Sequence, residues 1–455
     1  MRKIVQTSEE KYQTMTETPV KRLIIRLAIP TIISMMITSI YNAADTYFVG
    51  QLENVSATAA VGVGYPLMAV IQAFGFLFGQ GSGNFISRAL GRQENDEAER
   101  MAATGFVSAF LAGLVIMGLG LIFLKPLVRI LGATDTSETF SMDYVRWILI
   151  GTPWMASSLV LNNQLRFQGN ALFAMIGITS GGILNMVLDP VFIFVLDMGV
   201  AGAALATILS QLFSFVLLFI GTRRSDNVNI HIRNFTPNKY FLSEMFKGGL
   251  PSLFRQGISS VATSCLNLAA GVYGDAAVAA MSIVSRVMMI ASSAVIGFGQ
   301  GFQPVCGFNY GAKKYGRVRE GYFFCVQYGM LFLAFCSVLM GIFAPQLIAR
   351  VQPGDTTTMD IGAMALRLQC ITLPLTGFIT ISNMMMQTTA QTFRASIVAL
   401  GRQGLFFLPL ILVLPSLFGL LGIELAQPIA DAITFIMTVF LTKGLLKKLK
   451  TEGAE

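Results

Sequence analysis

Two aspartates stand inside long apolar segments, where an ionised side chain is costly. Asp45 lies in ITSIYNAADTYFVG (37–50), and Asp189 lies in NMVLDPVF (185–192). A charge at the centre of a membrane helix costs about 2.5–3.5 kcal/mol on insertion scales, so intramembrane acids usually mark the path of an ion or a substrate. Two carboxyl groups that meet in such a place can hold a proton or a hard cation such as Na⁺. The two residues therefore predict an ion-coupling site.

Polar side chains surround both aspartates at helical spacing. Asn185 lies one turn before Asp189 on the same helix face, and Tyr41 lies one turn before Asp45. Asn42 follows Tyr41, and a threonine of the next apolar segment reaches a similar depth. We expect one cation-coupling site for H⁺ or Na⁺, formed by Asp45, Asn185, Asp189 and Thr207 and supported by Tyr41 and Asn42.

Length and composition place these residues in a polytopic membrane protein. The chain has 455 residues, of which 54% are hydrophobic and 12% are charged. The charged fraction is about half that of a soluble domain. Because about 20 apolar residues cross the hydrocarbon core, the succession of long apolar segments predicts twelve transmembrane helices.

The basic residues indicate how these helices are oriented. Most of the 32 Lys and Arg residues lie in the terminal segments and in alternate turns, near residues 88–100, 166, 223–247, 313–319 and 394–402. Basic turns stay on the cytoplasmic side, so we expect both termini there, in a bacterial cytoplasmic (inner) membrane. The net charge of +8 then reflects topology, and no nucleic-acid partner is expected.

The second half of the chain repeats the first. AIPTIISMMITSIYNAADTYFVG (28–50) aligns with GLPSLFRQGISSVATSCLNLAAG (249–271), and FGQG occurs at both 78–81 and 298–301. Two similarly oriented halves imply a pseudo-two-fold axis along the membrane normal, as in alternating-access transporters. The predicted fold is all-α, with twelve transmembrane helices in two pseudo-symmetric six-helix lobes. The predicted parts are a cytoplasmic N-terminal segment (1–21), an N-lobe (22–221), a cytoplasmic linker (222–248), a C-lobe (249–442) and a cytoplasmic tail (443–455).

The repeat also tests the two aspartates. Asp45 aligns with Leu266, and Asp189 aligns with Leu408. The same helices are therefore built without either acid in the second half. A carboxyl group needed for folding would tend to occur in both halves, so we interpret the two acids as functional.

Other residues are candidates for a substrate cavity. Flexible, polarisable methionine side chains adapt to varied flat lipophilic cations, although core packing is their common role. Arg255 and Asp431 are further charges within predicted helices. The possible cavity residues are Met35, Met68, Met155, Arg255, Met288, Met385 and Asp431.

Several other motifs have simpler interpretations. The glycine-rich FGQGSGN (78–84) follows no predicted strand and lacks a P-loop lysine, so it indicates close helix packing. The five cysteines lie singly, and His231 is the only histidine. We therefore expect no cofactor, and no metal apart from Na⁺ at the coupling site.

The chain resembles the multidrug and toxic compound extrusion (MATE) family, and most closely its DinF-like and MepA-like prokaryotic branch. The resemblance rests on RLAIPTIISMMITSIYNAADTYFVGQL (26–52), FGQGSGNFISRALGR (78–92), NMVLDPVFIF (185–194) and GFGQGFQPVCGFNYGA (297–312). It implies two lobes around a V-shaped central cavity and export of organic cations in exchange for H⁺ or Na⁺. It also implies that Asp45, Asn185, Asp189 and Thr207 form the coupling site.

Two rival functions remain open. A lipid-linked oligosaccharide flippase of the same superfamily would need many basic residues in its cavity, whereas only Arg255 and Arg286 lie within predicted helices. An intramembrane aspartyl-type enzyme could use Asp45 and Asp189 as its acid pair. We favour a multidrug efflux antiporter that is not an enzyme, works by alternating access and functions as a monomer.

Overall fold

A computed structural model describes residues 8–51, 55–224, 228–352 and 355–452. Helices dominate it because a chain in lipid must satisfy its backbone hydrogen bonds internally. Within the described ranges, ten helices are long and apolar enough to cross a membrane. The helices α6 (Glu138–Phe167) and α9 (Lys239–Gly271) are equally long but more polar. With these two, the predicted set of twelve is complete.

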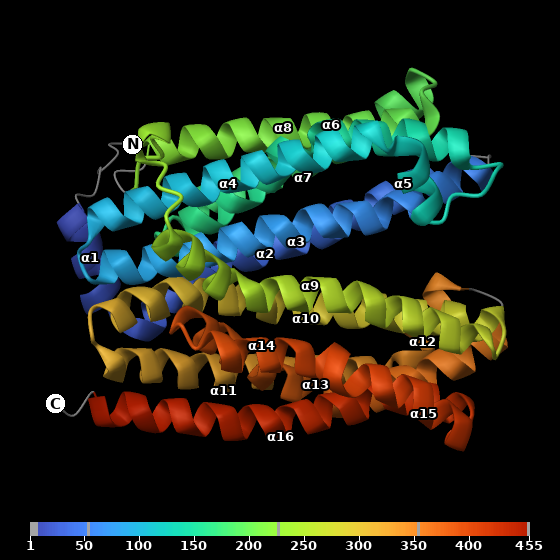
Figure 1. Ribbon diagram of the computed structural model, residues 1–455. Coiled ribbons are helices and arrows are strands. Elements are labelled where there is room, and N and C mark those ends of the chain that lie inside the picture. Colours follow the sequence, from blue (N-terminus) through green and yellow to red (C-terminus); the bar gives the residue numbers. More distant parts are fainter. Residues whose placement is uncertain (1–7, 52–54, 225–227, 353–354, 453–455) are drawn as a thin grey trace.

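The long helices are arranged in two bundles (Figure 1), each with six of them. The N-lobe contains α2 (Val20–Gly50), α3 (Val55–Gly91), α4 (Asn95–Ile122), α6, α7 (Ala171–Pro190) with its π-helical extension η1 (Val191–Val195), and α8 (Gly199–Arg224). The C-lobe contains α9, α10 (Asp275–Gly311), α11 (Tyr315–Ile342), α13 (Thr356–Thr388), the composite helix of α14 (Thr392–Leu400), η3 (Gly401–Phe407) and α15 (Leu408–Phe418), and α16 (Leu420–Glu452). Short elements are α1 (Ser8–Glu17), α5 (Leu124–Ile130), η2 (Ile232–Asn234) and α12 (Ala344–Val351).

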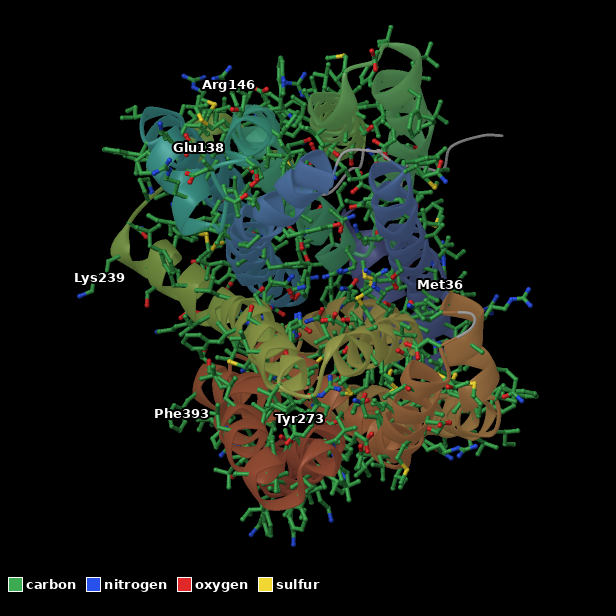
Figure 2. The ribbon with its side chains drawn as sticks, turned by 90° about the vertical axis from the view of Figure 1, so that its right-hand side faces the viewer. Met36, Glu138, Arg146, Lys239, Tyr273 and Phe393 are labelled. Carbon is green, nitrogen blue, oxygen red and sulfur yellow. The ribbon has the colours of Figure 1, made fainter. Side chains whose placement is uncertain are left out.

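The two bundles lie close together at one end of the molecule and diverge at the other (Figure 1). We call the end that carries α1 and the last turns of α16 the base, and the opposite end the far end. Figure 2 shows the two lobes nearly end-on, with Glu138 on the N-lobe and Tyr273 and Phe393 on the C-lobe.

The internal repeat is visible in matched hydrogen bonds. In the N-lobe, the Asn162 side-chain amide donates to the Ala174 carbonyl at 2.9 Å. In the C-lobe, the Asn383 amide donates to the Ala395 carbonyl at 2.6 Å. Donor and acceptor are both displaced by 221 residues, so the same contact joins the same pair of helices in each lobe.

Glycines of the repeated FGQG motif bring the lobes into contact near the base. A Cβ atom added at Gly301 on α10 would lie 2.5 Å from Cα of Ala28 on α2. A Cβ at Gly81 on α3 would overlap the carbonyl of Met245 on α9. Only glycine permits this approach of two helix backbones, so the predicted close packing of FGQG is confirmed.

Hydrogen bonds between the lobes continue to about the middle of the helices. The Thr31 hydroxyl donates to the Gly297 carbonyl at 2.6 Å. Further along the same two helices, the hydroxyls of Ser39 and Ser293 lie 3.3 Å apart. From there the bundles diverge toward the far end (Figure 1).

Candidate functional site

The structure brings Asp45 of α2 and Asp189 of α7 together within the N-lobe. Their side chains lie within hydrogen-bonding distance of each other. Asp189 is fully buried and Asp45 partly buried. Because two ionised carboxylates can only accept hydrogen bonds, this contact needs either a proton on one of them or a cation between them.

The two carboxylate oxygens of Asp189 have different surroundings. The Asn185 side-chain amide donates to Oδ1 of Asp189 at 3.1 Å. Among the described residues, the buried Oδ2 of Asp189 receives no hydrogen bond from a donor group. A buried acceptor without a partner costs about 1–3 kcal/mol, and a bound proton or cation would remove that cost.

Thr207 of α8 lies at the same depth as Asn185. The antiparallel helices α7 and α8 are fixed in register by Ser214, whose hydroxyl donates to the Gly177 carbonyl at 2.9 Å. Because the helices are antiparallel, seven residues back from Ser214 and seven residues on from Gly177 reach the same depth. These positions are Thr207 and residue 184, which is next to Asn185. The Thr207 hydroxyl donates to the Ala203 carbonyl at 3.0 Å, so its oxygen lone pairs remain available to a ligand.

Two tyrosines flank the aspartates. The ring of Tyr41 packs directly on α7, where a Cβ at Gly182 would lie 2.9 Å from it. Tyr144 of α6 is buried, lies within electrostatic reach of both aspartates, and donates its hydroxyl to the Met68 sulfur at 3.8 Å. Tyr144 was not a predicted site residue, because no spacing distinguishes it from a core aromatic. The predicted contribution of Asn42 falls on a side chain outside the described residues.

The predicted cavity methionines occupy two kinds of position. Met68 contacts Tyr144, and Met35 lies on the lobe interface, 3.9 Å from the Gln300 amide. The remaining three pack in the hydrophobic cores of the lobes. These are Met155, Met288 and Met385, and in this conformation none of them presents an open surface.

The other candidate charges have different surroundings. Asp431 of α16 is buried and accepts hydrogen bonds from Arg402 at 2.7 Å and from Gln427 at 2.8 Å. It therefore anchors the π-helical segment η3 to α16. Arg255 of α9 is partly exposed and lies close enough to Arg166 for the two guanidinium groups to repel each other.

The candidate site consists of oxygen-bearing side chains. Within the part of the chain that the structure describes, no three His, Cys, Asp or Glu side chains converge on one point. The oxygen atoms that do converge come from two carboxyl groups, with the Asn185 amide bonded to one of them and the Thr207 hydroxyl at a similar depth on α8. Such a donor set suits H⁺ or Na⁺.

Comparisons with known proteins agree with the duplicated architecture. The MatE family model matches the chain twice, over residues 30–191 and 251–413, which are the two halves of the repeat. The multidrug export protein MepA of Staphylococcus haemolyticus (strain JCSC1435) is 27% identical over 441 residues, covering 96% of each chain. MepA of Staphylococcus aureus (strain MSSA476) is 27% identical over 454 residues, covering 98% of this chain and 99% of its own.

A solved structure matches the whole arrangement. The outward-facing conformation of a multidrug resistance MATE family transporter superposes with a TM-score of 0.90 and 26% sequence identity, covering 96% of this chain and 98% of that one. The repeat, the two six-helix lobes and these full-length matches agree with one another. The chain therefore belongs to the MatE family and is a multi-pass multidrug efflux transporter of small molecules, not an enzyme.

Proposed function

We propose that the protein exports organic cations by alternating access in exchange for H⁺ or Na⁺, which binds at Asp45 and Asp189. The observation that carries this proposal is the contact between the two aspartates. It joins α2 to α7 in the N-lobe, and both acids are replaced by leucine in the repeated half.

Helix α2 is well placed to pass the effect of ion binding to the lobe interface. It carries Asp45 toward the far end and Thr31, which bonds to Gly297 of the C-lobe, about 21 Å nearer the base at 1.5 Å per residue. A proton or cation between Asp45 and Asp189 strengthens the contact of α2 with α7. The loss of that ligand frees α2 to change its packing on α10.

The available driving force is sufficient for such a cycle. One charge crossing 100 mV releases about 2.3 kcal/mol. Each unit of pH difference adds about 1.4 kcal/mol for a proton. The Asp45–Asp189 contact therefore needs to change the free-energy difference between the two conformations by only a few kcal/mol.

The basic residues determine the orientation within this proposal. The base faces the cytoplasm and the far end faces outward, in a bacterial inner membrane, with a monomer as the transporting unit. Divergence at the far end then corresponds to an outward-facing state, in agreement with the matched outward-facing transporter.

Transport by purified protein in liposomes tests the proposal. Ethidium efflux is measured for Asp45→Asn and Asp189→Asn under separately imposed H⁺ and Na⁺ gradients. Both variants should lose uphill transport under the gradient that drives the unaltered protein. Asp360→Asn is the matched control, since Asp360 is exposed on α13, and it should remain active. Uphill pumping by either site variant would refute the coupling role.

A further inference from the structure

A buried network of polar side chains joins the lobes between the coupling site and the base. The Arg166 guanidinium of α6 donates to Oε1 of Gln300 on α10 at 2.5 Å and to Oδ1 of Asn163 at 2.7 Å. Gln80 of α3 donates to the same Asn163 oxygen at 3.0 Å. Gln303 of α10 donates to Gln80 at 3.3 Å. All five side chains are buried.

This network shows how the repeat becomes asymmetric. Gln80 and Gln300 are the glutamines of the two FGQG copies, so each lobe contributes the same residue. Arg166 aligns instead with Gln387, whose amide stays within the C-lobe and donates to the Gly248 carbonyl at 2.7 Å and to Ser252 at 2.8 Å. The contact from Arg166 to Gln300 across the lobes thus has a charged group from one lobe only.

Sequence reasoning counted Arg166 among the basic residues of cytoplasmic turns. The structure corrects this assignment, because Arg166 lies in the last turn of α6 with a buried side chain. A buried guanidinium is costly unless it is well hydrogen-bonded. Here its acceptors are two neutral amide oxygens, and its Nε has no partner among the described residues.

We propose that Arg166 is a positioning residue for transport, which holds the base half of the two lobes closed through Gln300. When the lobes part at the base, the bond between Arg166 and Gln300 must break, and the guanidinium regains water. Gln300 is a neutral acceptor and Arg255 repels Arg166, so the bond between Arg166 and Gln300 is weak enough to break in each transport cycle. This inference rests on the alternating-access part of the proposed function and not on the identity of the coupling ion.

A second charged contact lies nearer the base. Arg88 of α3 donates to the Thr388 carbonyl of the C-lobe at 3.0 Å and pairs with Glu244 of α9 at 3.5 Å. Arg88 is eight residues beyond Gln80, or about 12 Å along the helix. Base opening therefore breaks two sets of contacts between the lobes, those of Arg88 and those of Arg166. The Arg166 contacts lie nearer the middle of the membrane.

Substitutions that should shift the ratio of base-open to base-closed molecules in opposite directions test the proposal. Arg166→Gln removes the charge and should raise the ratio of base-open to base-closed molecules about tenfold to a hundredfold. Gln300→Glu places a carboxylate against the guanidinium and should lower that ratio and slow turnover without raising KM. Arg166→Lys keeps the charge and should lie between Arg166→Gln and the unaltered protein. Gln387→Ala, at the repeated position within one lobe, is the control and should leave the ratio unchanged.

The ratio is measured from distances between spin labels at the base. Asp96→Cys on α4 and Glu320→Cys on α11 are exposed positions on opposite lobes, and they are labelled in a variant without the native cysteines. Opposite shifts for Arg166→Gln and Gln300→Glu would support the proposal. Shifts in the same direction, or no shift for Gln300→Glu, would overturn it, and Gln300→Glu decides the matter if Arg166→Gln fails to fold. Loss of coupling in the Asp45 variants is a separate result, so the two proposals can fail independently.

Discussion

Replacing Gly301 by alanine should favour the base-open conformation, because the added methyl group fits only when α2 and α10 separate. Its Cβ would lie 2.5 Å from Cα, 2.6 Å from N and 2.8 Å from Cβ of Ala28. Ordinary contacts between carbon atoms are about 3.5–4.0 Å, so the helices must move apart by about 1 Å or more. Backbone atoms cannot rotate away as a flexible side chain can.

The expected change in the ratio of base-open to base-closed molecules follows from the cost of overpacking. Forcing a methylene group into a well-packed contact costs about 1–3 kcal/mol. Only the conformation in which the two lobes touch at the base carries this cost. At 1.4 kcal/mol per factor of ten, the ratio of base-open to base-closed molecules should rise about fivefold to 150-fold.

Gly299, two residues earlier in the same motif, provides the control. A Cβ there would meet the side chains of Met384 and Ile381 within the C-lobe. Gly299→Ala therefore strains both conformations alike and should lower the melting temperature without changing the ratio. A cysteine at Met35, on the lobe interface, reports base opening through its labelling rate from the cytoplasmic side. Equal labelling rates for Gly301→Ala and Gly299→Ala would refute this reasoning.

Two further predictions concern stability. Asn162→Ala and Asn383→Ala remove equivalent hydrogen bonds and should each lower the free energy of unfolding by about 1–3 kcal/mol, measured by thermal unfolding in detergent. Unequal losses would show that the repeated contact is not equivalent in the two lobes. Outside the membrane, hydrogen bonds from Arg129 and Lys125 hold the pKa of Glu138 below its usual value of 4.5. This contribution is present above pH 4.5 and is lost as pH falls through the lowered pKa, so Glu138→Gln should flatten the loss of stability with acid below pH 4.5.

The fold could be predicted because lipid leaves the chain few alternatives. Backbone groups in the hydrocarbon core must be hydrogen-bonded internally, so long apolar segments had to be helices. The more polar helices α6 and α9 were included in the predicted twelve because their segments are also long and largely apolar, and the repeat additionally aligns α9 with α2.

Side-chain surroundings were harder to predict than helices. Asp45 and Asp189 could be paired because depth along a helix follows from residue count and because a buried acid is rare. The sequence could not show whether Met385 lies in the core or lines a cavity, since methionine suits both a core and a binding surface. Arg166 was missed for another reason: a basic residue near a helix end usually reaches the membrane surface, and only the packing of α6 buries it.

The strength of the Arg166 contact is matched to the work that transport can perform. A hydrogen bond to a charged group contributes about 1.5–3 kcal/mol, and one charge crossing 100 mV releases about 2.3 kcal/mol. An ion pair at the same place would add the attraction of a second charge, about 4 kcal/mol for unit charges 4 Å apart at an effective dielectric constant of 20, offset by the cost of burying the carboxylate. A glutamine opposite Arg166 thus holds the base closed and still lets each cycle open it, whereas a glutamate at Gln300 should hold it more firmly. The proposed coupling acids and Arg166 all belong to the N-lobe, and their counterparts Leu266, Leu408 and Gln387 are neutral. Under the proposed function, ion binding acts within the N-lobe, and the C-lobe contributes a neutral acceptor, Gln300, to the Arg166 contact.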